Sequence, residues 1–295
     1  MNINNIFKEL VNDIYISGFE YEDPNRKGVI RKQIPFYDFK WEFKNGFPSL
    51  GLKQSFPKLA FQEMLCFMKG INNLKELKKE GINFWDKDGY NYYKRKTKKE
   101  VVSFEEFLEK NPGDLGKIYP FQIRNWNSSL DQLNLILNRL KENKHTTKNI
   151  VSMWNPSDMQ DMALSPCHWS FELIVEPKGL WIKWNQASTD VFLGLPMNIM
   201  YYSYLCIILA HYLDMQPLGI IGNLTNLHLY DNSFKAVEEL LKRNPYELSK
   251  VEVENNLPQS WSNLDDYLNQ LNYTQVKVKN YKHLGKLNVE MLPYG

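Results

Sequence analysis

The chain has 295 residues, of which 43% are hydrophobic and 14% aromatic. This is enough apolar material for a sizeable core and argues against disorder over most of the length. The 36 basic and 34 acidic side chains leave a formal net charge of +2, which makes nucleic acid an unlikely partner, because nucleic-acid-binding domains are usually strongly basic.

No part of the sequence is typical of export, membrane insertion or metal binding. The N-terminus has no basic region followed by an apolar run, so we expect no signal peptide. The most apolar stretch, residues 199–213, is interrupted by Ser203 and His211 and is short for a membrane span, so we expect a buried helix. The irregularly spaced Cys66, Cys167 and Cys206 form neither a disulfide framework nor a zinc pattern, which indicates a reducing compartment. We therefore expect a cytoplasmic protein without a metal site.

The first part of the chain predicts helices and strands in alternation, with helical spacing marking the former and alternating polarity the latter. The expected elements are helices over 3–14, 57–69 and 72–79, a loop over 23–28, and two short strands over 29–43 with a break at Pro35.

Residues 87–113 are charged and rich in tyrosine, and we expect them to form a surface insertion. The segment from Ser103 to Glu106 has the capping pattern of a short helix. The basic run around Lys94 to Lys96 is typical of a solvated face, with a basic rim over a ligand site as the alternative.

The second part of the chain completes an α+β pattern without repeats or linkers, so we expect a single domain over residues 1–295. The expected elements are helices over 130–140, 234–241 and 264–271, a long helix from Pro196, and strands over 149–154, 170–175, 180–184, 218–230, 250–254 and 275–279.

The most informative stretch ends in Ser165-Pro166-Cys167-His168. A cysteine beside an imidazole can have a lowered thiol pKa, which favours the nucleophilic thiolate. Taken alone, the pair fits equally well a buried structural cysteine next to a hydrogen-bonded histidine.

Further motifs around this pair resemble those of the thymidylate synthase family. The segment Glu63 to Gly70 resembles that family's Glu-Leu-Leu-Trp-Phe-Leu-x-Gly, and Gln186 to Ile199 resembles its signature from Gln-Arg-Ser to Leu-Pro-Phe-Asn-Ile. His228-Leu229-Tyr230 resembles its His-x-Tyr, and Trp85-Asp86 and residues 114–119 fall in the expected order. The resemblance covers residues 26–232, and this many motifs in one order are hard to obtain by chance.

The resemblance implies the family's α+β fold, a mixed β-sheet with flanking helices whose sheets pack back to back in a homodimer. It also implies folate-dependent methylation or hydroxymethylation of C5 in a uracil nucleotide resembling dUMP, with 5,10-methylenetetrahydrofolate as cofactor. Cys167 would add to C6 of the ring and so activate C5, which is covalent catalysis.

The resemblance assigns the remaining roles residue by residue. The catalytic residues would be Cys167, Glu63, Tyr119 and His168, with Glu63 managing protons near O4 and Tyr119 tied to removal of the C5 proton. The substrate-binding residues would be Asn198, Asp190, His228, Tyr230, Ser188, Gln186, Arg26 and Lys148. The folate-binding residues would be Trp85, Leu164, Asp190, Gly194 and Met197, the last standing where phenylalanine is usual.

Each of these residues also has an ordinary structural interpretation. Glutamate is mostly exposed, so Glu63 could lie on a helix surface. Tyr119 and Tyr230 could be core tyrosines with satisfied hydroxyls, His228 could cap a strand, and Trp85 could fill the core.

The sequence departs from the family mainly at the site for the 5′-phosphate. Arg26 and Ser188 match, but Ala187 stands where an arginine is usual, and Thr147 and Lys148 stand where the partner subunit lends two arginines. Lys144 and His145 could partly compensate. Losing charge-assisted contacts worth roughly 1.5–3 kcal/mol each would weaken phosphate binding strongly.

Three explanations stay open. The site is rebuilt around a nucleotide, or the substrate is a pyrimidine lacking that phosphate, or the usual activity is lost. A deoxypyrimidine nucleotide hydroxymethyltransferase is an alternative, as is a non-catalytic nucleotide-binding or RNA-binding relative. Pro120, Ile123 and the C-terminal residues 291–295 also depart from the family pattern.

Overall fold

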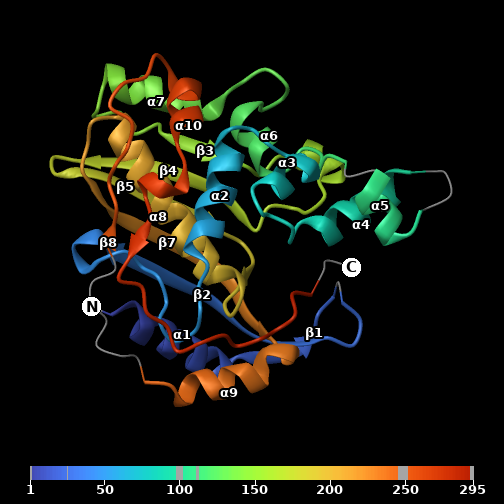
Figure 1. Ribbon diagram of the computed structural model, residues 1–295. Coiled ribbons are helices and arrows are strands. Elements are labelled where there is room, and N and C mark those ends of the chain that lie inside the picture. The colour runs from blue at the N-terminus through green and yellow to red at the C-terminus, as the bar shows by residue number, and fades with distance from the viewer. Residues whose placement is uncertain (1, 25, 98–101, 111–112, 245–251, 293–295) are drawn as a thin grey trace.

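The fold is described from a computed structural model, in which helices pack against a mixed sheet (Figure 1). The structure describes residues 2–24, 26–97, 102–110, 113–244 and 252–292. The main sheet has seven strands in the order β1-β2-β7-β5-β4-β3, with β6 also paired to β7. Its strands are β1 Phe19–Glu22, β2 Ile30–Glu42, β3 Ile150–Ser152, β4 His168–Glu176, β5 Gly179–Gln186, β6 Thr189–Asp190 and β7 Pro217–Tyr230.

The sheet is mixed because β7 runs parallel to β5 and β6, whereas the other pairs are antiparallel. A separate two-stranded sheet joins β8 Glu252–Val253 to β9 Val278–Lys279. The expected α+β fold with a mixed sheet is confirmed.

Helices pack mainly on one side of this sheet and at its ends (Figure 1). They are α1 Ile3–Ser17, α2 Pro57–Met68, α3 Leu74–Lys79, α4 Asp86–Lys96, α5 Phe104–Lys110, α6 Tyr119–Arg124, α7 Gln132–Glu142, α8 Gly194–Tyr212, α9 Phe234–Lys242 and α10 Leu264–Gln270. Short 3-10 helices cover Phe43–Asn45, Pro156–Asp161, Asp231–Ser233 and Tyr273–Gln275.

Helix α8 is the centre of the core, as the apolar stretch predicts. It contacts β5, β7 and α2, and most of its side chains are buried all round the helix. A helix that is apolar on every side is stable only when other elements cover all of it. The helix begins at Gly194 rather than at Pro196. Its first residues line the cavity that is described below.

The prediction of two short strands over 29–43 is wrong. Strand β2 runs unbroken through Pro35 and pairs with β7 from Arg31 opposite Tyr230 to Glu42 opposite Gly219. Strand β1 pairs only with residues 30–33, so Pro35 lies where β2 has a free edge among the described residues. Proline is tolerated at a strand edge because no partner needs its missing N–H.

Other expected boundaries change for local reasons. Helices α4 and α6 were not predicted, and Pro120 occupies the first turn of α6, where proline is favoured. The expected strand over 275–279 is reduced to Val278–Lys279, because a capping box between Asn272 and Gln275 closes a 3-10 turn just before it. Of the expected strand over 250–254, residues 250 and 251 lie outside the described part of the chain.

Residues 87–113 form most of α4 and all of α5, which project from the body of the molecule (Figure 1). Ser103 Oγ accepts a hydrogen bond from Glu106 N at 3.1 Å, which confirms the capping pattern. Tyr90 and Tyr93 pack against Phe107, so this unit has its own aromatic contacts. Lys94, Arg95 and Lys96 are exposed and do not line the cavity described below, which favours the solvated face over the basic rim.

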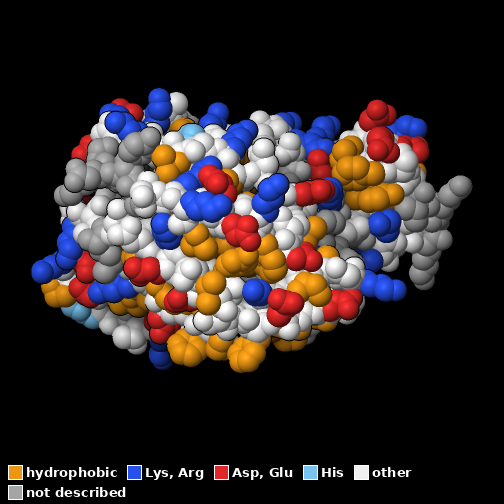
Figure 2. All heavy atoms as spheres, turned by 90° about the horizontal axis from the view of Figure 1, so that it is seen from below, with side chains coloured by type: hydrophobic (Ala, Val, Ile, Leu, Met, Phe, Trp, Pro, Cys, Tyr) orange, Lys and Arg blue, Asp and Glu red, His pale blue; other side chains and the backbone are white. Residues whose placement is uncertain are grey.

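The surface has mixed charge on the side of α1 and α9. Figure 2 shows basic and acidic side chains interspersed there, with hydrophobic groups between them. Among the helices of the described residues, none is long and apolar enough to cross a membrane.

Candidate active site

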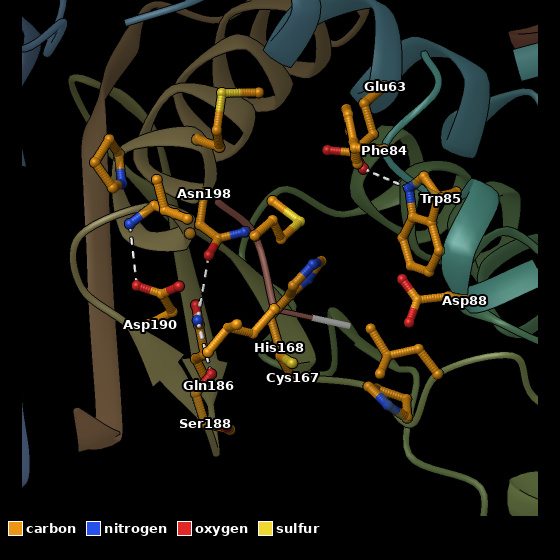
Figure 3. Close-up of a pocket in the computed structure, with 18 of the residues that line it drawn as sticks. Glu63, Phe84, Trp85, Asp88, Cys167, His168, Gln186, Ser188, Asp190 and Asn198 are labelled. Atoms are coloured by element: carbon orange, nitrogen blue, oxygen red, sulfur yellow. Dashed lines mark hydrogen bonds between the residues drawn. The ribbon is translucent and has the colours of Figure 1, made fainter. Parts of the chain in front are cut away.

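One cavity of about 670 Å³ collects the predicted site residues. Of the sixteen residues predicted for catalysis or binding, all but Lys148 line it. They come from α2, the start of α4, α6, the segment before β4, the start of α8, the end of β7 and the loop before β2. Figure 3 shows Cys167 and His168 between Trp85, Glu63 and Asp88 on one side and Asn198, Gln186 and Asp190 on the other.

Cys167 is half-buried at the wall of the cavity. Its backbone N–H donates to the Tyr119 hydroxyl at 2.8 Å. Burial raises the pKa of the thiol to about 11, while a hydrogen bond from Tyr119 and the positive charge of Arg26 act in the opposite direction. The thiol is therefore protonated in the free protein at neutral pH, and a bound substrate must assist its ionisation.

His168 is buried, and its contacts do not suit it to activate the Cys167 thiol. Its Nδ1 lies 2.7 Å from the Tyr202 hydroxyl, and its ring stacks on Tyr119 with centroids 4.3 Å apart. Burial lowers the pKa of the imidazole to about 3, so it stays neutral. The structure thus argues against an imidazolium that lowers the thiol pKa, and His168 instead fixes the Tyr119 ring.

Glu63 projects from α2 into the cavity rather than into solvent. Its Oε1 accepts a hydrogen bond from Trp85 Nε1 at 2.9 Å (Figure 3). Burial raises the pKa of the carboxyl to about 7, and the bond from Trp85 opposes that shift. A carboxyl with a pKa near neutrality can both give and take protons, which suits general acid–base work.

The amide of Asn198 has a fixed orientation. Trp184 Nε1, which can only donate, bonds to Gln186 Oε1 at 3.1 Å. Gln186 Nε2 must then face Asn198, and it donates to Asn198 Oδ1 at 3.2 Å. The Asn198 Nδ2 group is therefore left as a donor for a carbonyl oxygen in the cavity.

His228 and Tyr230, at the end of β7, offer one acceptor and one donor. His228 Nδ1 lies 2.7 Å from the Asn226 carbonyl oxygen, which can only accept, so Nε2 is the free acceptor. Tyr230 accepts from Arg26 Nη1 at 3.0 Å, so its own proton is available. Such a pair suits a hydroxyl group, which both donates and accepts.

Apolar side chains also line the cavity. Leu164 and Met197 are half-buried, and the rings of Phe84 and Trp85 lie beside each other with centroids 6.5 Å apart. Asp190 Oδ1 accepts from the backbone N–H groups of Phe192 and Leu193, both at 3.0 Å. The arrangement fits a flat, partly aromatic group that carries a few hydrogen-bond donors.

The remaining end of the cavity holds the loop before β2. Arg26 donates to the Leu292 carbonyl oxygen at 3.3 Å as well as to Tyr230. Ala187 and Ser188 line the same cavity, whereas Lys148 is exposed and outside it. Met291 and Leu292 line the cavity too, and residues 293–295 lie outside the described residues.

Several lining residues were missed from the sequence: Asp23, Arg31, Lys53, and Asp88. Lys53 is only 8% exposed, and burial lowers the pKa of its amine to about 8 against the opposing effect of Asp190. The sequence did not single out Arg31 among the charged residues of segment 29–43. Tyr202, the partner of His168, was not singled out either, since its place depends on the packing of α8.

Comparison with known proteins decides the family. A family model described as thymidylate synthase matches residues 5–293. The chain belongs to the thymidylate synthase family. The match extends beyond residues 26–232, which carry the motifs, in both directions along the chain.

Curated thymidylate synthases are similar over most of their length. The thymidylate synthase of Mesoplasma florum is 30% identical, covering 97% of this chain and 98% of its own. That of Mycoplasma genitalium is 34% identical over 74% of this chain and 79% of its own. The thymidylate synthase of Enterobacteria phage T4 is 31% identical over 84% of both chains.

Proposed function

We propose that this enzyme methylates C5 of a uracil 2′-deoxynucleotide resembling dUMP, with folate as the one-carbon source. The observation that carries the proposal is one cavity in which Cys167, Glu63 and Tyr119 lie beside an Asn198 amide of fixed orientation. The thymidylate synthase family and its named relatives support a one-carbon transferase.

The apolar part of the cavity fits a reduced folate. Trp85, Leu164 and Met197 provide flat and flexible apolar surface next to Gly194, and the Asp190 carboxylate can accept from ring N–H groups. When bound, 5,10-methylenetetrahydrofolate supplies the one-carbon unit and the hydride that make a methyl group.

The residues of this chain perform the covalent part of the reaction. The Cys167 thiol loses its proton, and its sulfur forms a bond to C6 of the uracil ring. The electron pair of the C5–C6 double bond moves toward C5 and O4, where Asn198 Nδ2 donates to the developing negative charge. Glu63 can supply or remove a proton on the O4 side.

Later the C5 proton must leave. The Tyr119 hydroxyl lies 2.8 Å from Cys167 N, and being neutral it can take this proton only by passing its own proton to a neighbouring acceptor. The bond between sulfur and C6 then breaks, the double bond re-forms, and the thiol is regenerated. The sulfur leaves with the bonding electron pair as a thiolate, and because burial raises the pKa of the Cys167 thiol to about 11, it then takes up a proton and does not add back to C6.

Release of tritium from C5-labelled dUMP tests the proposal. We expect folate-dependent release together with a product heavier by one methylene group. Release with a hydroxymethyl product would favour the hydroxymethyltransferase alternative, and binding without any release would favour the non-catalytic one.

We also propose a cytoplasmic homodimer, each chain being a single domain with residues 87–113 as a surface insertion. Thr147 and Lys148 are exposed and lie outside their own cavity, so Lys148 can serve a phosphate only from a partner chain. Phe36, Ile150 and Trp169, on strands of the main sheet, are 67%, 54% and 38% exposed, and a second sheet would cover such apolar groups. Light scattering should give twice the 34.9 kDa of one chain; a monomer at micromolar concentration contradicts the proposal.

A further inference from the structure

The sugar end of the cavity contains a second arginine that the family motifs do not assign. Arg31 lies in β2 opposite Tyr230 of β7 and lines the same cavity as Arg26 and Ser188. It is therefore close to the residues proposed for the sugar, on the side where a 5′-phosphate must be bound.

Arg26 and Arg31 share one buried carboxylate. Arg31 Nη1 lies 2.9 Å from Asp23 Oδ2, and Arg26 Nη1 lies 3.5 Å from Asp23 Oδ1. The Asp23 side chain is fully buried, and each arginine side chain is 16% exposed. Two guanidinium groups and one carboxylate leave an excess positive charge at this end of the cavity.

One atom of the Arg31 guanidinium is left unsatisfied. Its Nε is buried and has no hydrogen-bond partner among the residues that the structure describes, and leaving a buried donor unsatisfied is costly unless a ligand completes it. The electrostatic effect of both arginines reaches the sugar end. Burial raises the pKa of Tyr230 to about 12, and the charges of Arg26 and Arg31 oppose that shift.

We infer that Arg31 is a second guanidinium for the 5′-phosphate of the substrate, compensating within this chain for the arginine absent at Ala187. Asp23 holds Arg31 and Arg26 side by side, so their charge is in place before the ligand arrives. A planar fork is better suited to phosphate oxygens than a lysine amine. The inference rests on the proposed function, because it assumes a nucleotide in this cavity.

Paired titrations of dUMP and deoxyuridine test it on the full chain, since the two ligands differ only in the phosphate. We expect Arg31→Gln to weaken the binding of dUMP by about 10- to 100-fold and to change the affinity for deoxyuridine by no more than about 2-fold. Arg31→Lys should fall between, because it keeps the charge but loses the fork. The matched control is Lys27→Gln, which removes one charge from an exposed residue of the same loop and should change neither ligand by more than about 2-fold.

A purely structural role for Arg31 predicts a different result. If Arg31 only anchors Asp23, its loss will weaken both ligands equally or neither, and either result overturns the inference. Since Arg31→Gln removes an ion-pair partner of Asp23, the double variant Asp23→Asn/Arg31→Gln is measured beside it and judged by the same ratio of dUMP affinity to deoxyuridine affinity. Absence of tritium release from dUMP by the unmodified enzyme would instead count against the proposed function, whatever Arg31 does.

Discussion

The two ends of the cavity differ in how closely they keep the family pattern. At the end proposed to hold the base, Cys167, Tyr119 and Asn198 match the motifs; Cys167 N bonds to the Tyr119 hydroxyl at 2.8 Å, and Asn198 Oδ1 accepts a hydrogen bond at 3.2 Å. At the phosphate end, Ala187 has replaced an arginine, while Arg31 and Asp23 form a pair that no motif describes. Bond-making chemistry needs particular atoms at fixed positions, whereas a phosphate needs positive charge and donors that can come from several backbone positions.

The largest expected effect is at the base end. Cys167→Ala removes the sulfur that bonds to C6, so tritium release from C5 should fall by roughly 10⁴-fold or more. Retained dUMP binding and an unchanged circular dichroism spectrum would show that the cavity is intact. Release near the unmodified rate would rule out the covalent mechanism.

The next effect concerns Glu63. Glu63→Gln keeps the shape of the side chain but cannot exchange a proton, so kcat should fall by roughly 10²- to 10⁴-fold.

The same substitution also tests the raised pKa of Glu63 through its effect on stability. Because the folded carboxyl has a pKa of about 7 whereas an ordinary glutamate has a pKa of 4.5, the native state holds its proton more tightly than the unfolded chain does. The free energy of unfolding therefore falls as pH rises between these values and levels off above them.

Thermal melts of both proteins across that pH interval measure this contribution. The unmodified enzyme should lose stability relative to Glu63→Gln as the pH rises from about 4.5 to about 7. Parallel melting profiles would mean that Glu63 titrates as an ordinary exposed carboxyl.

A smaller effect is expected in base recognition. In Asn198→Asp the carboxylate still accepts from Gln186 Nε2, but it cannot donate to uracil O4, whereas it can accept from a cytosine amino group. The ratio of kcat/KM for dUMP to that for dCMP should fall by roughly 10²-fold or more. Asn198→Ala is the control, because it removes both the donor and the acceptor and should lower turnover of dUMP without favouring cytosine. An unchanged ratio in Asn198→Asp would exclude Asn198 from base recognition.

The same contrast explains what the sequence could predict. The buried helix follows from an unbroken apolar run, and the base-end residues follow from motifs whose spacing brings them to one cavity. The position of Arg31 could not be predicted, because it depends on the pairing of Arg31 with Tyr230 across two strands far apart in the chain. The neutral state of His168 likewise depends on Tyr202, which approaches only when α8 packs onto the sheet.

The smallest expected effect is a gain, obtained by restoring the family residue at Ala187. Ala187 is half-buried and lines the cavity, so a longer side chain can extend toward the phosphate end. Its backbone is fixed by the bond from Ala187 N to the Cys167 carbonyl oxygen at 2.7 Å and by Asn226 Nδ2 donating to the Ala187 carbonyl oxygen at 2.8 Å. The substitution should therefore change the side chain without moving the backbone.

A new guanidinium there should strengthen the binding of dUMP by about 10-fold. This is a small gain for a charge-assisted contact, because Arg26 and Arg31 already supply positive charge nearby. Deoxyuridine is the control ligand and should bind as before. In the Arg31→Gln background the same substitution should give a larger gain, since it replaces a lost contact rather than adding a third. Equal gains in the two backgrounds would mean that positions 31 and 187 act on the phosphate independently. No gain in either, with the new side chain seen pointing into the cavity, would mean that this end has been remodelled for a group other than a 5′-phosphate.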